Sequence, residues 1–147
     1  MQDDGSETIL LDLFRTNQFR ERLIATAMDG LELPPEDYPF YVIIGAEGPW
    51  TPTALAARLE MPLSTVLFRV RRLEKRGHAE RTPNPDDRRS YLVELSEDGR
   101  RLLGQARPRF RALALAVEQR LGGDRVSGLR GGLGELREAI ESELSPG

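Results

Sequence analysis

The sequence predicts a mainly α-helical fold that carries one small β-hairpin. Apolar residues recur at helical spacing over most of the chain. Residues 51–76 read as two short amphipathic helices around a tight turn, with a proline near the start of each. Residues 79–82 and 90–95 predict two short strands joined by a turn-rich loop. Helix, turn, helix, strand, loop, strand is the order of elements in a winged helix-turn-helix.

Composition indicates a folded domain and excludes several kinds of site. The chain has 147 residues, of which 39% are hydrophobic and 31% are charged, so it is long enough to bury a core. It contains no cysteine, which excludes disulfides and thiolate metal sites. His78 is the single histidine, which argues against a histidine-based metal centre. We therefore expect no metal and no cofactor.

The sequence contains no signal for export or membrane insertion. No apolar run approaches the roughly 20 residues that span a bilayer. The first residues are acidic, whereas a secretory signal begins with basic residues. We expect a cytoplasmic protein that binds no membrane.

Positive charge is concentrated in one segment, although the net charge of the chain is −3. Residues 1–49 hold three arginines against ten acidic residues, whereas residues 69–89 hold eight basic residues against four acidic ones. A local cationic surface on an acidic protein suits docking to DNA. A solvated helix face with intrahelical ion pairs explains the same segment equally well at this stage.

The N-terminal part predicts a long helix and then a short one. Apolar residues at helical spacing predict a helix over residues 7–30, with Ser6 as its N-cap. Pro34 and Pro35 must interrupt it. Residues 40–44 are apolar without a break and fit a buried strand or a buried helix by periodicity alone. We favour the helix because the run is short and occupies the first-helix position of the motif.

The C-terminal part predicts two further helices. Ser96 opens a long helix, which Pro108 should kink or split. Gly122 and Gly123 form a hinge, after which Asp124 can cap the last helix. That helix carries an apolar stripe that needs a partner surface: Leu129, Leu133, Leu136, Ile140 and Leu144.

The second helix of the motif predicts a surface that reads DNA. At about 100° per residue, one face of residues 63–76 is apolar and forms the core stripe: Leu63, Val66, Val70 and Leu73. The opposite face combines hydroxyl groups near the N-terminal end with cations further along, which suits the major groove. Its candidate DNA-binding residues are Ser64, Thr65, Phe68, Arg69, Arg71, Arg72 and Lys75.

Phe68 is unexpected on a face that we predict to be exposed to solvent, and two interpretations of it stay open. The ring could contact thymine methyl groups. Alternatively, the helix is slightly rotated and the ring is tucked under a neighbouring side chain.

The loop at residues 83–89 supplies a second candidate DNA contact. Asp87 and Arg89 are two residues apart, so the carboxylate can hold one guanidinium while Arg88 or Arg89 projects. An arginine at a hairpin tip can enter a narrow minor groove, where the potential is most negative. A neutralised surface turn is the alternative, and the basic helix just before the loop makes it less attractive.

A motif runs from this loop into the following helix. Asp87-Arg88-Arg89 precedes an apolar strand that ends at Leu95, and Ser96 stands three residues before Gly99. The pattern resembles the MarR (multiple antibiotic resistance regulator) family of winged-helix repressors, whose signature is Asp-x-Arg, an apolar strand and Leu-Thr-x-x-Gly. The runs Thr51-Pro52-Thr53-x-Leu55-Ala56 and Leu73-Glu74-Lys75-Arg76-Gly77 match as well. Leu67 and Phe68 depart from the family, which often has hydroxyl or arginine side chains there.

The resemblance implies a homodimer that binds a pseudo-palindromic operator in double-stranded DNA. Repression would be relieved by a small, often aromatic, ligand near the junction of the dimer and DNA-binding regions. Asp87 would brace the wing, and Arg89 would contact the minor groove. The implied regions are 1–33 for dimerisation, 34–95 for DNA binding and 96–147 for dimerisation, with Leu10, Leu13 and Phe14 joining the C-terminal stripe in the dimer.

Other functions have less support. The sequence lacks a nucleophile elbow, a phosphate-binding loop and a dinucleotide fingerprint, so we do not expect an enzyme. We interpret His78 as a half-buried turn residue, with pH sensing as a minor option. A winged helix used only for protein contacts remains an alternative. Tyr41, Phe14 and Phe19 could line a ligand pocket or belong to the core, and repressor versus activator is open.

Overall fold

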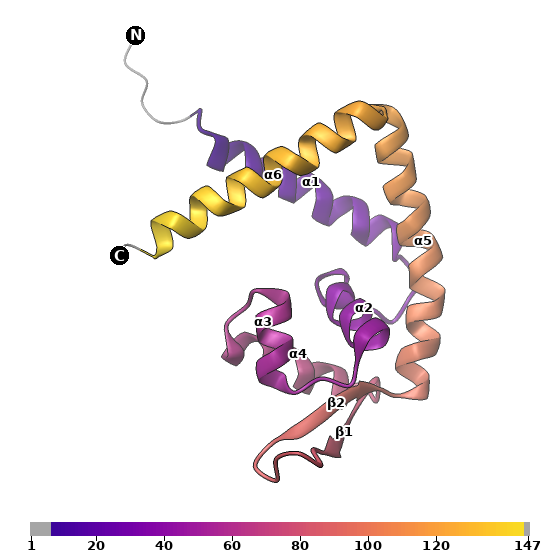
Figure 1. Ribbon diagram of the computed structural model, residues 1–147. Coiled ribbons are helices and arrows are strands. Elements are labelled where there is room, and N and C mark those ends of the chain that lie inside the picture. Colours follow the sequence, from indigo (N-terminus) through magenta and orange to yellow (C-terminus); the bar gives the residue numbers. More distant parts are fainter. Residues whose placement is uncertain (1–6, 146–147) are drawn as a thin grey trace. The chain divides into compact units, whose positions relative to one another are not determined.

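The computed structural model describes residues 7–145 and divides into two compact units, residues 1–110 and residues 111–147 (Figure 1). The first unit contains α1 to α4, the hairpin and the beginning of α5. The second contains the rest of α5 and α6. The mainly helical fold with a two-stranded antiparallel sheet confirms the predicted fold class. No helix among the described residues is long and apolar enough to cross a membrane.

Helix α1 spans Ile9–Ala27. The Oγ1 atom of Thr8 accepts a hydrogen bond from the backbone N–H of Leu11 at 3.3 Å, so Thr8 is the N-cap. Ser6, which the sequence suggested for that role, lies outside the described residues. Most apolar side chains of α1 are exposed in the single chain, and Ile24 alone among those described in this helix is buried.

Residues 40–44 are helical, as favoured from the sequence. A short 3-10 turn, η1 (Pro35–Asp37), leads into α2 (Tyr38–Glu47). Tyr38, Phe40, Tyr41 and Ile44 are all buried, so the helix contributes to the core on more than one face. This burial explains why the apolar run showed no clear period.

The helix-turn-helix consists of α3 (Pro52–Leu59) and α4 (Leu63–Lys75). Thr51 caps α3 by accepting the Ala54 N–H at 3.1 Å, as predicted. On α4 the predicted core residues Val66, Val70 and Leu73 are buried. Leu63 was wrongly placed in that stripe, because its side chain is 43% exposed at the first residue of the helix.

The wing is the antiparallel pair β1 (Ala79–Pro83) and β2 (Tyr91–Leu95) with its connecting loop, residues 84–90. Val93 is fully buried, pairs with Arg81 across the hairpin and forms an isolated bridge with Trp50 on its other side. The bridge ties the wing to the segment between α2 and α3. The base of the wing is therefore anchored in the core.

A tight junction between the wing and α5 explains the Ser-x-x-Gly part of the motif. The hydroxyl of Ser96 donates to the Gly77 carbonyl at 2.5 Å and accepts the Gly99 N–H at 3.1 Å. A Cβ on Gly99 would lie only 2.1 Å from the His78 carbonyl oxygen, so no side chain fits there. The junction fixes where α5 begins relative to the end of α4.

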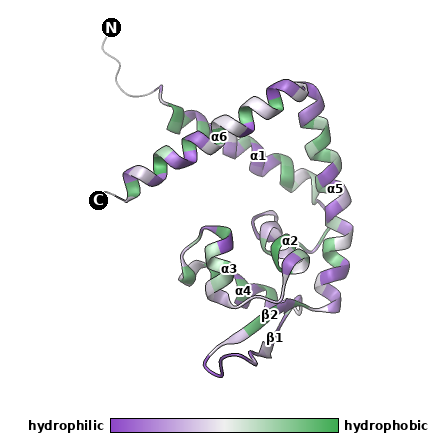
Figure 2. Ribbon diagram, viewed as in Figure 1, coloured by the Kyte–Doolittle hydropathy of each residue, from purple (hydrophilic) through white to green (hydrophobic). Residues whose placement is uncertain are grey.

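Helix α5 (Glu97–Leu121) continues through Pro108, so the expected split does not occur. Helix α6 (Gly123–Leu144) follows Gly122, whose φ of 87° makes the turn without a side-chain cap. Asp124 lies in the first turn and is not the N-cap, which corrects the sequence prediction. No described residue of α6 is buried, and hydrophobic residues alternate with hydrophilic ones along it (Figure 2).

Candidate nucleic-acid interface

The outer face of α4 presents small polar, aromatic and cationic side chains to solvent. Ser64, Phe68, Arg71 and Lys75 are exposed, and Thr65 is half-buried beside them. Among the described residues, neither Arg71 nor Lys75 forms an ion pair. The Phe68 side chain is 59% exposed, so the interpretation that tucked the ring under a neighbour is wrong.

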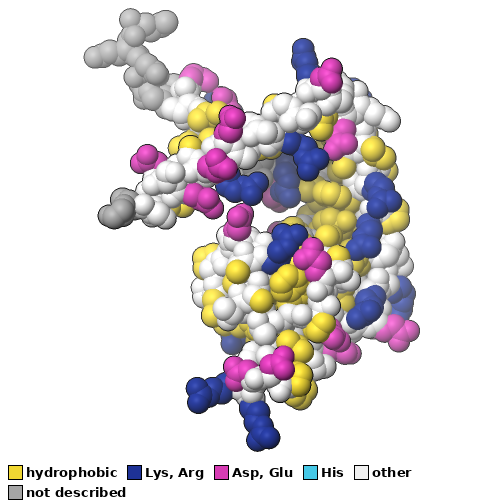
Figure 3. Space-filling model, viewed as in Figure 1, with side chains coloured by type: hydrophobic (Ala, Val, Ile, Leu, Met, Phe, Trp, Pro, Cys, Tyr) yellow, Lys and Arg dark blue, Asp and Glu magenta, His cyan; other side chains and the backbone are white. Residues whose placement is uncertain are grey.

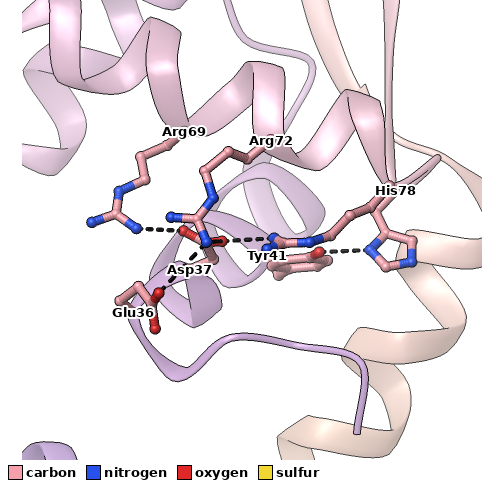
Figure 4. A network of polar contacts seen from close by, with 7 residues as sticks. Glu36, Asp37, Tyr41, Arg69, Arg72 and His78 are labelled. Carbon is pink, nitrogen blue, oxygen red and sulfur yellow. Dashed lines mark hydrogen bonds and ion pairs between the residues drawn. The ribbon is translucent and has the colours of Figure 1, made fainter.

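A second group of arginines, two on α4 and one at its C-cap, faces inward onto one carboxylate. Arg69 Nη1 donates to Asp37 Oδ1 and Arg76 Nη1 donates to Asp37 Oδ2, each at 2.8 Å. Figure 4 shows the Asp37 side chain lying between the arginines of α4 and the start of α2. The Asp37 side chain is 0% exposed, so its charge depends on these guanidinium groups for compensation. We call Asp37, Arg69, Arg72 and Arg76 the Asp37 cluster.

Arg72 is the loosest member of the Asp37 cluster. Its Nη2 atom lies 3.6 Å from Asp37 Oδ2 and 3.6 Å from Glu36 Oε1, beyond good hydrogen-bonding distance. Its guanidinium carbon also lies 5.9 Å from the centre of the Phe68 ring. Arg69 and Arg72 were both predicted to contact DNA, and in this structure both are directed towards Asp37.

Sequence reasoning missed Asp37, although a signal was present. Arginines at positions 69, 72 and 76 are three and four residues apart and so share one flank of a helix. Asp37 stands directly before the apolar run that forms α2. The pairing itself needed the tertiary structure, because the arginines lie more than 30 residues further along the chain.

Burial and charge shift the pKa values of two groups beside the cluster. Burial raises the pKa of the Tyr41 phenol above its ordinary value of 10.0 and outweighs the opposing effect of Arg76. For Arg76, burial lowers the pKa, but the hydrogen bond and charge of Asp37, with Tyr41, together raise it above the ordinary value. Arg76 therefore stays a cation at every physiological pH.

His78 is hydrogen-bonded to Tyr41 of the core. Its Nδ1 atom lies 2.7 Å from the Tyr41 hydroxyl in a buried hydrogen bond (Figure 4). The side chain is buried rather than half-buried, which corrects the expectation for this turn residue. Tyr41 is itself fully buried and belongs to the core.

The arginines at the tip of the wing face solvent, in contrast to those of the Asp37 cluster. Arg88 and Arg89 are exposed, and neither forms an ion pair among residues 7–145. Asp87 Oδ1 accepts the backbone N–H of Arg89 at 2.9 Å, so it holds the loop backbone rather than a guanidinium. Figure 3 shows basic side chains that project from the end of the hairpin, with acidic ones beside them.

Arg81 connects the wing to the end of α4. Its Nε atom donates to Glu74 Oε1 at 2.7 Å, and its guanidinium carbon lies 4.2 Å from the centre of the Tyr91 ring. The hydrogen bond to Glu74 raises the pKa of Arg81. Arg81 therefore contributes to the local positive charge while it holds the wing against α4.

The described residues contain no group of three or more histidine, cysteine, aspartate or glutamate side chains that could hold a metal ion.

Comparison with known proteins identifies the family. The MarR family's sequence profile matches residues 42–91, the segment from α2 to the start of β2. The multiple antibiotic resistance protein MarR of Salmonella typhimurium is 30% identical over 97 residues, which cover 66% of this chain and 67% of that protein. This chain belongs to the MarR family. The resemblance inferred from the wing motif is confirmed.

Two solved structures of transcription regulators align with this chain along most of its length. A probable transcriptional regulator from Pseudomonas aeruginosa aligns with a TM-score of 0.81 and 30% identity, covering 89% of this chain and 98% of that one. A mutant MarR from E. coli, solved in complex with operator DNA, aligns with a TM-score of 0.82 and 26% identity, covering 92% and 99%. The chain is a DNA-binding winged helix-turn-helix transcription regulator of this family.

Proposed function

We propose that this MarR-family regulator is a homodimeric repressor that binds a pseudo-palindromic operator and is released by a small, often aromatic, ligand. The observation that carries the proposal is the placement, at two points of one compact unit, of exposed cations that form no ion pair with any residue in the range 7–145. They lie on the outer face of α4, at Arg71 and Lys75, and at the tip of the wing, at Arg88 and Arg89.

The proposed DNA contacts follow from groove geometry. Helix α4 enters the major groove, where Ser64 and Thr65 near its N-terminal end reach base edges or phosphates. Arg71 and Lys75 bind the phosphate backbone or donate hydrogen bonds to the O6 and N7 atoms of guanine. The wing lies over the adjacent minor groove with Arg88 and Arg89, while Asp87 braces the loop backbone. The DNA-binding region is residues 34–95.

Dimerisation is assigned to residues 1–33 and 96–147. The single chain leaves large apolar side chains uncovered on both α1 and α6, which supports burial against a second copy. Those of the proposed contact residues that are clearly exposed are Leu10, Leu13, Phe14, Leu129, Leu133 and Leu144. Leu136 and Ile140 are half-buried members of the same stripe.

A cavity beside the Asp37 cluster supports an effector site. It has a volume of about 560 Å³, within the usual range for small-molecule sites, and is lined by Leu31, Glu32, Leu33, Pro34, Arg76 and His78. Arg76 belongs to both the cavity and the cluster, so a ligand that displaces it would disturb α4. Tyr41 lies in the core, whereas Phe14 and Phe19 are 61% and 67% exposed and do not line this cavity.

DNA binding is tested with fragments of the source genome selected on the purified protein and then titrated by fluorescence anisotropy at several salt concentrations. Affinity for a selected fragment should fall linearly on logarithmic axes, with a slope of about −0.9 per neutralised phosphate. Absence of salt-dependent binding to any duplex would favour the alternative of a winged helix that contacts only proteins. Transcription from the selected promoter, with and without aromatic compounds, then tests repression and its release.

The dimer is tested by sedimentation equilibrium at micromolar concentration. The proposal expects a dimer for the natural chain and dissociation for Leu133→Glu, because a carboxylate would enter the apolar stripe. Ser142→Glu, which adds the same charge at an exposed position on the opposite side of α6, is the matched control and should leave the dimer intact. A monomeric natural chain would refute the architecture.

A further inference from the structure

Phe68 is the most exposed large apolar side chain on the recognition surface. It is the sixth residue of α4 and is 59% exposed. Ser64 and Arg72 lie one turn away on either side of it on the same face. An aromatic ring left in water at the centre of a functional face gains free energy when a partner covers it.

Two guanidinium groups next to this ring on α4 are directed towards acidic side chains. Arg69 is hydrogen-bonded to Asp37 at 2.8 Å, and Arg72 is directed towards Glu36 and Asp37. Arg72 also approaches the Phe68 ring to 5.9 Å, which favours a fixed ring position. In this structure the side chain that projects outward on this flank of α4 is consequently the Phe68 ring rather than an arginine.

The base edges of the major groove offer one apolar group, the 5-methyl of thymine. Phe68 is surrounded by cations, with Arg71 and Lys75 exposed on the same face. These cations suit a phosphate-rich partner and would oppose burial against an apolar protein surface. Since α4 enters the groove in the proposed function, on which this inference rests, the ring is directed at base edges. We propose that Phe68 is a specificity residue that recognises a thymine through its 5-methyl group in each half-site.

The decisive probe is an operator in which deoxyuridine replaces thymidine one position at a time, because this exchange removes only the methyl group. The operator is first obtained by selection from random double-stranded DNA. For the natural chain, deoxyuridine at one position of each half-site should weaken binding roughly fourfold per methyl group removed, because this is the effect of exposing one buried methyl. Phe68→Ala should bind the thymidine operator and its deoxyuridine counterpart with equal affinity. Phe68→Leu should retain part of the difference in affinity.

Arg88→Ala is the matched control, since it removes a wing contact and leaves α4 unchanged. It should weaken binding to the thymidine and deoxyuridine operators alike and preserve the ratio of the two affinities. Thermal melting of Phe68→Ala should match the natural chain, because the side chain is exposed and its loss leaves no cavity. If the natural chain binds its selected operator but ignores every thymidine exchange, or if Phe68→Ala keeps the ratio, the inference is overturned. Failure to select any DNA would instead overturn the proposed function.

Discussion

The arginines of α4 and the arginines of the wing differ in how they are held. Arg69 and Arg76 are bound at 2.8 Å to a fully buried carboxylate, whereas Arg88 and Arg89 project into solvent without an ion pair among the described residues. The same residue type therefore serves two purposes in one compact unit. The first pair shapes the protein, and the second pair is available to a ligand.

The difference has a physical basis in the surroundings of each group. A buried carboxylate is costly unless it is paired and hydrogen-bonded, so Asp37 commits its arginines to the fold. The wing arginines lose little by staying hydrated and lose side-chain entropy only when they meet DNA. Counting positive charges along the sequence treats the two sets alike, so the sequence predicts DNA contacts for Arg69 and Arg72 as well as for Arg88 and Arg89.

The largest expected effect comes from removing the buried carboxylate. Asp37→Asn leaves the guanidinium groups of Arg69 and Arg76 without their counter-charge and should lower the free energy of unfolding by about 3 kcal/mol. Urea denaturation followed by circular dichroism measures it. Glu47→Gln, which removes the exposed ion pair between Glu47 and Arg58, is the control and should change stability little. Equal effects from the two variants would mean that Asp37 is no more important than a surface charge.

Loss of a wing arginine should affect binding and not folding. Arg89→Ala should weaken operator binding by about 2 kcal/mol and leave the melting temperature unchanged. The measurement is a gel-shift titration beside a thermal melt. Arg107→Ala, an exposed arginine on α5, is the matched control. Unchanged operator affinity in Arg89→Ala would contradict the assignment of the wing.

The Tyr41–His78 hydrogen bond extends the Asp37 cluster into the core. Tyr41→Phe leaves a buried imidazole nitrogen without its partner and should cost about 1–2 kcal/mol of stability. Because burial raises the pKa of Tyr41, the neutral phenol stabilises the fold. This contribution is complete below pH 10 and is lost as the pH rises through the raised pKa. Urea midpoints between pH 8 and 11 should fall less steeply for Tyr41→Phe, and identical profiles would count against this role.

Substitution of Arg72 should give the smallest effect on DNA binding. It tests whether Arg72 belongs with the arginines that stabilise the fold or with those that contact DNA. Its contacts at 3.6 Å are long enough that the side chain can leave Asp37 for a base. Arg72→Ala should relax the preference at one operator position by about 1 kcal/mol with little loss of stability. Selection from random DNA compares the two proteins. If both return the same site, Arg72 belongs with Arg69 and Arg76 as a structural residue.

Local patterns were sufficient to predict most of the elements. Apolar periodicity, the Thr51-Pro52 cap and Gly77 indicate helices whose ends depend on neighbours only a few residues away. The Asp-x-Arg and Ser-x-x-Gly spacings indicate the wing and its junction with α5 for the same reason. These features depend on short-range hydrogen bonds and steric limits, which each segment carries in its own residues.

The fold class, the order of the elements and the position of the cationic segment follow from the residues alone. Which of these cations remain available to a ligand depends on packing, because Asp37 reaches Arg69 and Arg76 across 32 and 39 residues of chain. The exposure of Phe68 and the burial of His78 were decided at the same level. Both depend on how α4 is rotated against α2 and the wing, which is a property of packing between distant segments and not of any one of them.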